Sequence, residues 1–211
     1  MSGWYDKISV FYDTLTVFFY RQKRKDLLDN LQIKSGERFL VIACGTGQSF
    51  EMIENRIGEA GEIIGIDSSE GMLRRAFKRI EKHGWKNITL LKADARNISR
   101  EFFEQRHIKT NFDVVLGELA FTVIPEWKKV MRNSVELLHE NGKLGILDWY
   151  RPKNDLLGRL VNFFAHSDLT RNVAGYAGKL TDFRIIKTYF FGNIFIGAGR
   201  KKPVDPQWNK N

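Results

Sequence analysis

The sequence predicts an α/β fold with a mostly parallel sheet, and two observations point to it. From Phe39 onward, apolar runs that suit buried strands alternate with helix-compatible stretches. Such alternation implies a parallel sheet covered by helices on both faces. The rhythm breaks over residues 184–200, where FRIIKTYFF and IFIGAG flank Gly192-Asn193, a two-residue connection typical of a tight hairpin. We therefore expect a seven-stranded sheet that ends in an antiparallel hairpin.

The expected elements follow one another as repeated strand–helix units. The strands are expected at residues 38–43, 62–66, 88–91, 112–116 and 143–148, and the helices at 48–57, 70–83 and 126–139. Gly84, Pro125 and Asn141-Gly142 punctuate them. Residues 1–31 lack strand alternation and are expected to form one or two helices.

The first strand–helix–strand unit carries the clearest signal for a ligand site. Its first apolar run ends in the small-residue turn CGTG at residues 44–47, and its second ends in Asp67. Glycines let the backbone approach a ligand closely, and the following helix N-terminus offers N–H groups and positive potential. An acid at the end of the next strand can accept both hydroxyls of a ribose. The pattern therefore indicates a cofactor that carries a nucleoside.

The position three residues after Gly47 narrows the choice of cofactor. Dinucleotide sites place a third glycine there, so that the helix comes close under a pyrophosphate. This chain has Phe50 instead, and it contains no GxxxxGK[ST] phosphate loop. A cofactor with a ribose but no phosphate fits better.

Five blocks in order, over about residues 37–150, carry a family resemblance: ACGTG, GIDSSEGML, LLKADARNI, FDVVLGELAFTVIPEW and LLHENGKLGILDW. With them the chain resembles the class I S-adenosylmethionine (SAM) methyltransferases, within the type 11 group that holds quinone-biosynthesis and phospholipid N-methyltransferases. The resemblance implies a Rossmann-like fold, SAM as cofactor and methyltransferase activity. Two positions depart from the family pattern. Val41 replaces an acid that helps to orient the amino end of the cofactor, and Ala43 replaces the first glycine. A non-catalytic SAM-binding protein is the alternative that Val41 raises.

The resemblance also implies the site residues. The methionine end of SAM would be lined by Ala43, Cys44, Gly45, Thr46 and Gly47, and the ribose hydroxyls would be bound by Asp67. The adenine would be flanked by Ser68 and Met72, and its amino group would donate to Asp94, with Ala95 beside it. The sulfonium would lie near Gly117 and Glu118. Glu118 could orient the cofactor amino group, act as a base or cap the following turn. The candidate catalytic residues are Glu118, Tyr12 and His166. No His, Cys and Asp grouping has the spacing of metal ligands.

The expected organisation is a helical segment over residues 1–36 that covers the active site, a methyltransferase domain over 37–202 and a tail over 203–211. Within the domain, residues 151–183 form an insert that is expected to be an acceptor pocket or a lid. The preferred acceptor is an amine headgroup phospholipid. A quinone precursor methylated on carbon and a soluble small molecule are the alternatives. RNA is a further alternative, but nucleic acid is disfavoured. GELA replaces the [DN]-P-P-[YF] motif of amino-methylating nucleic-acid enzymes, which counts against methylation of adenine N6 or cytosine N4.

Charge indicates where such an acceptor would be met. Residues 143–211 hold 12 Lys and Arg against 5 Asp and Glu, a net +7 within the +9 of the whole chain. A run of aromatic and then basic residues, 17–25, suits a lipid–water boundary. No secretory signal and no run of about 18 apolar residues occurs. We therefore expect a cytoplasmic protein in peripheral contact with the anionic inner face of the membrane.

Overall fold

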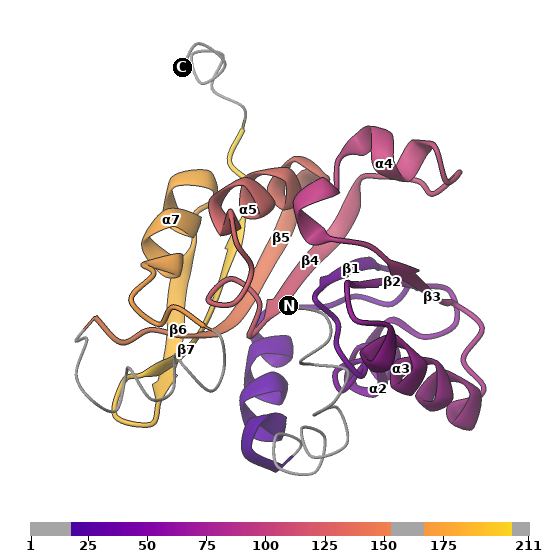
Figure 1. The fold of residues 1–211 in the computed structure, drawn as a ribbon, viewed down its shortest axis with the longest axis horizontal. Helices are drawn as coiled ribbons and strands as arrows, with labels where there is room; N and C mark the ends of the chain where they lie inside the picture. The colour runs from indigo at the N-terminus through magenta and orange to yellow at the C-terminus, as the bar shows by residue number, and fades with distance from the viewer. Residues whose placement is uncertain (1–17, 153–166, 204–211) are drawn as a thin grey trace.

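The computed structural model describes residues 18–152 and 167–203 (Figure 1). The first helix of the described residues covers residues 18–30. The elements after it are β1 (Arg38–Ile42), α2 (Phe50–Ile57), β2 (Glu62–Asp67), α3 (Glu70–His83), β3 (Ile88–Lys92), the 3₁₀ turn η1 (Ala95–Asn97), α4 (Arg100–Glu104), β4 (Phe112–Glu118), α5 (Trp127–Glu136), β5 (Leu138–Trp149), α7 (Val173–Leu180), β6 (Arg184–Tyr189) and β7 (Ile194–Arg200). The expected domain boundaries stay predictions.

The seven strands form one sheet in the order β3-β2-β1-β4-β5-β7-β6. Strands β1 to β5 pair in parallel, whereas β7 is antiparallel to both β5 and β6. The predicted mostly parallel sheet with a terminal hairpin is confirmed. The strand order reverses at β1, which lies between β2 and β4, and open α/β sheets bind ligands beyond the carboxyl ends of the strands at such a point.

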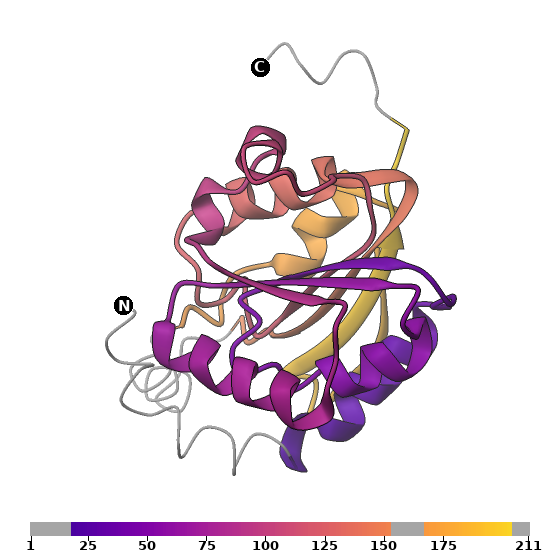
Figure 2. The ribbon, with the colours of Figure 1, turned by 90° about the vertical axis from the view of Figure 1, so that its right-hand side faces the viewer.

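Helices cover both faces of the sheet, so the molecule has three layers (Figure 2). The helix over residues 18–30 packs with α2 and α3 on one face, where Leu27, Leu28 and Ile53 are fully or almost fully buried. Helices α4, α5 and α7 cover the other face. Among the described residues, no helix combines the length and the apolarity needed to span a bilayer.

The two ends of α3 are set by local chemistry. At its start, the Ser69 hydroxyl accepts a hydrogen bond from the backbone N–H of Met72, at 3.1 Å. At its end, Gly84 takes the left-handed conformation that closes many helices. The capping residue lies two positions after Asp67, the acid that ends β2, so α3 begins directly beyond the strand end.

Several boundaries differ from the sequence prediction. The helix expected over residues 126–139 is α5, which ends at Glu136, because the chain enters the next strand at Leu138. Strand β5 begins at Leu138 rather than at residue 143, because Asn141 adopts a φ of +67° and the strand continues past it as a bulge. The hairpin connection is also longer than predicted. Strand β6 ends at Tyr189, so the connection comprises the four residues 190–193 instead of Gly192-Asn193 alone. The two phenylalanines expected in the strand are turn residues.

Phe50, the residue in place of a third glycine, fills the space between the loop after β1 and strand β2. It is fully buried, and a Cβ added to Gly47 or to Gly65 would come within 2.5 or 2.9 Å of its ring. The ring therefore occupies the volume that a close helix–strand approach would need. With a phenylalanine at this position, the space between α2 and the sheet is filled by a side chain, whereas a dinucleotide site leaves it to a glycine.

We predict that Phe50→Ala lowers the free energy of unfolding by about 3–5 kcal/mol, because it removes a fully buried ring and leaves a cavity. Phe77→Ala is the matched control, since Phe77 on α3 is 53% exposed, and its cost should stay near 0.5 kcal/mol. Urea denaturation of both variants measures the difference. Equal costs would contradict the packing role of Phe50.

Candidate functional site

The loop that follows β1 holds three residues in the left-handed conformation. Ala43, Gly45 and Gly47 have φ values of +50°, +56° and +70°. Glycine adopts such angles freely, whereas an alanine in this conformation costs about 1–2 kcal/mol. Nothing lies within 4 Å of the point where a Cβ at Gly45 would be. The loop therefore keeps its shape at Ala43 under strain and leaves room for a ligand beside Gly45.

Asp67 ties this loop to the start of α3. Its Oδ2 accepts a hydrogen bond from the backbone N–H of Gly45, and its Oδ1 accepts one from the N–H of Ser69, both at 2.8 Å. A carboxylate has about four lone-pair sites, enough to fix the loop and to accept from ligand hydroxyls as well. Asp67 lies at the carboxyl end of β2, next to the central strand β1, as the sequence predicts.

Glu118 lies at the carboxyl end of β4 and is held by two segments that the sequence analysis did not connect with it. Its Oε2 accepts from Arg24 Nε at 3.0 Å and from the Ser49 hydroxyl. Arg24 belongs to the helix over residues 18–30, and Ser49 precedes α2. The Arg24 and Glu118 side chains are only 6% and 11% exposed.

The second oxygen of Glu118, Oε1, is buried and has no hydrogen-bond partner among the described residues. A buried acceptor without a partner is costly, and such atoms are few in folded proteins. The register pairs Gly117 with Ile42, so Glu118 stands beside Ala43 at the start of the left-handed loop. Its position suits a ligand that brings an N–H or O–H donor.

Asp148, near the end of β5, holds the turn that follows β4. Its carboxylate accepts from the backbone N–H groups of Phe121 and Thr122 at 2.9 and 3.2 Å, and from the Thr122 hydroxyl at 2.6 Å. This carboxylate is thus the one seen to cap the turn, a role that the sequence left open for Glu118. Full burial raises the pKa of Asp148 to about 6, although its hydrogen bonds oppose the shift. Sequence analysis missed this residue, yet the rule that singled out Asp67 and Asp94, an acid at a strand end, applies to it.

The residues predicted around the adenine follow β2 and β3. Met72 is 3% exposed and Ala95 is 9% exposed, whereas Ser68 lies at the surface. The Asp94 carboxylate accepts from the backbone N–H of Arg96 at 2.9 Å and from its Nη2 at 2.6 Å. The Arg96 guanidinium lowers the pKa of Asp94. An adenine amino group would therefore share this carboxylate with Arg96.

Contacts within the protein account for several of the remaining predicted residues. Burial raises the pKa of the Cys44 thiol, which suits a packing role better than a reactive one. The Thr46 carbonyl accepts from Arg79 Nε at 3.1 Å. A Cβ at Gly117 would come within 2.5 Å of the Phe121 ring, so packing alone accounts for that glycine. The candidate catalytic residues Tyr12 and His166 lie outside the described residues.

Comparison with known proteins identifies the family. Residues 33–176 match the family model described as a methyltransferase domain. The chain belongs to this methyltransferase family. It is 28% identical over 135 residues to demethylmenaquinone methyltransferase of Lactobacillus johnsonii, covering 64% of this chain and 52% of that protein. It is 29% identical over 140 residues to aklanonic acid methyltransferase DauC of Streptomyces sp. strain C5, covering 66% and 60%. The chain thus spans between half and three-fifths of the length of these relatives.

Solved structures share the Rossmann-like methyltransferase fold. A SAM-dependent methyltransferase of Aquifex aeolicus superposes with a TM-score of 0.60 at 20% identity, over 85% of this chain and 89% of that one. Phosphoethanolamine N-methyltransferase 2 of Haemonchus contortus, in complex with SAM, superposes with a TM-score of 0.68 at 15% identity, over 87% and 53%. The described site has three features that are compatible with the SAM cofactor expected from the sequence. It has room beside Gly45, an acid at the end of β2, and a buried carboxylate oxygen on Glu118 that lacks a donor.

We predict that the stability contributed by Asp148 falls as pH rises. Its carboxyl keeps the proton up to about pH 6 in the folded chain, against 3.8 when unperturbed. Between these values the folded state binds more protons, so the free energy of unfolding decreases with pH, by up to about 3 kcal/mol. Asp148→Asn removes the titration and keeps one acceptor oxygen. Unfolding curves from pH 4 to 7 should therefore show a steeper decline for the wild type than for the variant. Parallel declines would refute the assignment.

Proposed function

We propose that this methyltransferase transfers the methyl group of SAM to a quinone-type acceptor. Sequence similarity carries the proposal, since the relatives that match over about two-thirds of the chain include demethylmenaquinone methyltransferases at 26–28% identity. The phosphoethanolamine N-methyltransferases match at 15–18% identity, which speaks for the fold alone. Of the acceptors expected from the sequence, the quinone precursor therefore has the better support.

For the cofactor, we propose the residues implied by the family resemblance. Asp67 would accept from the ribose hydroxyls, Gly45 and Gly47 would let the loop approach the methionine end, and Asp94 with Met72 would border the adenine. SAM supplies a methyl carbon already activated by the sulfonium, so the protein has mainly to align donor and acceptor and exclude water. The acceptor atom bonds to that carbon while the carbon–sulfur bond breaks and leaves its electron pair on sulfur.

Glu118 is proposed to replace the acid that the family places at position 41. Val41 is 3% exposed and packs in the apolar core, so it contributes no charge. Glu118 brings a carboxylate to the same loop from the neighbouring strand β4. Arg24 and Ser49 orient it through Oε2. Oε1 would then accept from the amino group of SAM, a role that matches its burial without a partner.

A ring carbon that gains a methyl group must lose a proton, so a base is required. Glu118 is the described candidate, because its second oxygen is uncommitted by any hydrogen bond among the described residues. Asp148 is not suited, since its fully buried carboxylate holds the turn after β4. Tyr12 and His166 stay candidates from the sequence.

An amine headgroup phospholipid is the second candidate acceptor. The observation that favours it is again the buried Glu118 oxygen, because a carboxylate lacking a donor suits an amine or ammonium group as well as the cofactor. For either acceptor we propose that catalysis takes place in peripheral contact with the anionic cytoplasmic face of a membrane. The net +7 of residues 143–211 supports this contact.

We predict that Asp67→Ala weakens SAM binding about 5- to 150-fold, because a hydrogen bond to a charged group contributes about 1–3 kcal/mol. Isothermal titration calorimetry with SAM and with S-adenosylhomocysteine measures the change. Glu70→Ala is the matched control. Glu70 lies three residues after Asp67, its side chain is exposed, and its substitution removes the same charge. Equal affinities of the wild type and Asp67→Ala would refute the ribose assignment.

We predict that the enzyme methylates a prenylated quinol and not phosphatidylethanolamine. Each acceptor is supplied in detergent micelles with SAM, under reducing conditions for the quinol, and products are identified by mass spectrometry. Transfer to phosphatidylethanolamine alone would reverse the order of the two candidates. Absence of transfer to both, with transfer to a water-soluble compound, would establish a soluble small-molecule enzyme.

Glu118→Gln in the same assay separates the two proposed roles of this residue. If Glu118 orients the cofactor, the Kd for SAM rises and the pH profile of kcat keeps its shape. If Glu118 is the base, the Kd stays constant, while kcat falls and the limb of the pH profile that reports the base disappears. A variant with unchanged Kd and kcat would exclude both roles.

A further inference from the structure

Exposed aromatic residues from two distant parts of the chain gather at the tip of the β6–β7 hairpin. Phe191 is 99% exposed and Phe190 is 48% exposed, and their ring centroids are 5.9 Å apart. The ring of Phe19, in the first described turn of the helix over residues 18–30, lies 6.3 Å from that of Phe190. Phe18, the residue before it, is 81% exposed. We call these four phenylalanines the aromatic tip.

The backbone of the hairpin turn adds a second observation. Phe190 and Phe191 have φ values of +50° and +55°, and the N–H of Gly192 donates to the Tyr189 carbonyl at 3.1 Å. Such a turn favours Asn-Gly, because bulky side chains are strained at positive φ. The two phenylalanines strain the turn, and Phe191 gains almost no burial from it. The stability of the folded chain therefore does not account for Phe191.

The aromatic tip lies on the cofactor edge of the sheet. Ile194, the first residue of β7, pairs with Trp149 at the carboxyl end of β5, and the rings of Trp149 and Phe190 are 5.8 Å apart. The turn before Ile194 therefore extends beyond the same edge as Glu118 and the loop after β1. Figure 1 shows the hairpin turn and the start of the helix over residues 18–30 together at the bottom of the molecule.

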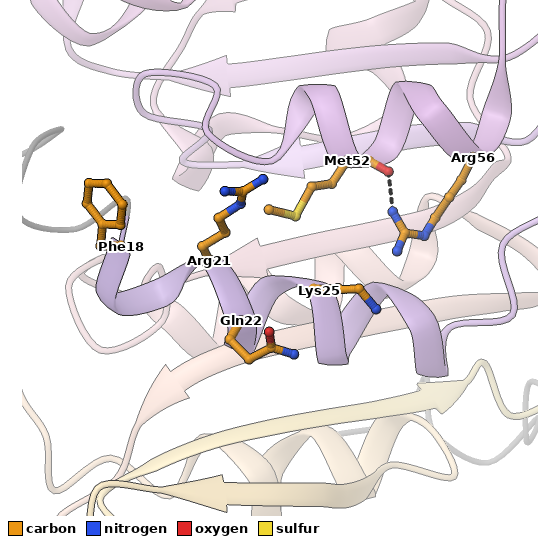
Figure 3. A pocket seen from close by; sticks show the side chains of 6 residues that line it. All are labelled: Phe18, Arg21, Gln22, Lys25, Met52 and Arg56. Atoms are coloured by element: carbon orange, nitrogen blue, oxygen red, sulfur yellow. Dashed lines mark hydrogen bonds between the residues drawn. The ribbon is translucent and has the colours of Figure 1, made fainter.

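A basic hollow adjoins the aromatic tip. It lies between the helix over residues 18–30 and α2, measures about 470 Å³, and is lined by Phe18, Arg21, Gln22, Lys25, Met52 and Arg56 (Figure 3). Lys25 and Arg56 share the carboxylate of Asp29. No carboxylate of the described residues forms an ion pair with Arg21, which points across the hollow toward Met52. The hollow therefore has an excess of positive charge.

We propose that the aromatic tip enters the headgroup boundary of an anionic lipid bilayer while Arg21 and the cations beside it contact lipid phosphates. Aromatic rings next to exposed cations are complementary to such a boundary, where rings are buried and phosphates are reached at the same depth. This inference rests on the membrane contact proposed above and names the surface that makes it. Docking in this way turns the cofactor edge toward the bilayer, so a lipid-borne acceptor reaches the site from the membrane.

The test is co-sedimentation of the full chain with vesicles of phosphatidylcholine, with or without 30% phosphatidylglycerol, at low and high salt. The central variant is the double substitution Phe190→Asn with Phe191→Gly. It removes both rings and supplies the residues that the turn prefers. The relief of turn strain should offset the lost contacts of Phe190 with Phe19 and Trp149, so the unfolding temperature should stay close to that of the wild type. We expect its partition onto anionic vesicles to fall at least tenfold. Phe77→Asn, which removes an exposed ring on α3, is the matched control and should bind as the wild type does.

Arg21→Glu tests the electrostatic part, with Lys78→Glu on α3 as the control, because Arg21 and Lys78 are both exposed. Each cation near an anionic surface contributes about a fivefold gain in binding, so reversal at Arg21 should lower partition at least fivefold. Binding of the wild type should weaken as salt rises. An equal loss of binding in Arg21→Glu and Lys78→Glu would mean that binding depends on the net charge of the protein. It would overturn the assignment of the hollow as the phosphate-contacting surface.

The outcomes separate the two proposals. No sedimentation of the wild type with anionic vesicles at low salt would overturn the membrane contact itself. Sedimentation that persists in the Phe190→Asn, Phe191→Gly variant would overturn the aromatic tip and leave the contact standing. The wild type could instead fail to bind vesicles and form a dimer that light scattering no longer detects in that variant. This result would assign the tip to contact with a second copy of the chain and overturn the lipid proposal. SAM affinity, measured on every variant, reports on the cofactor site independently.

Discussion

The buried ion pair between Arg24 and Glu118 joins the helix over residues 18–30 to the proposed cofactor edge of the sheet. Both side chains are almost fully buried, and removing either one would leave the other as an uncompensated charge. The pair therefore depends on the helix over residues 18–30 being in place, and the orientation of the Glu118 carboxylate depends on the pair. Through Ser49, the same carboxylate also reaches the residue before α2. One interaction thus connects three segments around the proposed methionine end of SAM.

The same helix is fixed on its other side by the hairpin. Asp26 accepts from Lys187 Nζ at 2.7 Å and from the Tyr189 hydroxyl at 2.6 Å, and these bonds lower the pKa of Asp26 to about 2. Tyr20 accepts from Trp149 Nε1 at 2.9 Å. The helix thereby holds the aromatic tip and the cofactor site in one arrangement, so an enzyme docked by its tip would present its site at a fixed height.

Backbone strain is present at the edge where the function is proposed. Ala43, Leu119, Phe190 and Phe191 all have positive φ values and all follow the carboxyl end of a strand or sit in the turn beside one. Residues in such conformations persist only where their surroundings hold them. Asp148 holds the turn after Leu119, and Asp67 holds the loop after Ala43. Buried or half-buried carboxylates thus support two of the strained segments.

What the sequence determined by itself is the local part of the candidate site. The turn at residues 44–47 and the acid at position 67 follow from spacing, because a strand, a glycine turn and a second strand are recognisable from neighbouring residues. The alternation of strands and helices likewise determined the parallel sheet. The acids at strand ends could be located for the same reason, and Asp148 was within reach of that rule.

Only the tertiary structure decided which distant residues meet. Arg24 and Glu118 are 94 positions apart, and Phe19 meets Phe190 across most of the chain. Such contacts depend on the order of strands in the sheet and on the packing of a helix against its edge, and hydrophobic periodicity carries no information on either. The positive φ of Phe190 and Phe191 could not be predicted from the sequence either. Aromatic residues favour strands, but the register of β6 with β7 places these two residues in the turn. Which distant residues contact one another depends on how the whole sheet is assembled, so it cannot be inferred from any single residue.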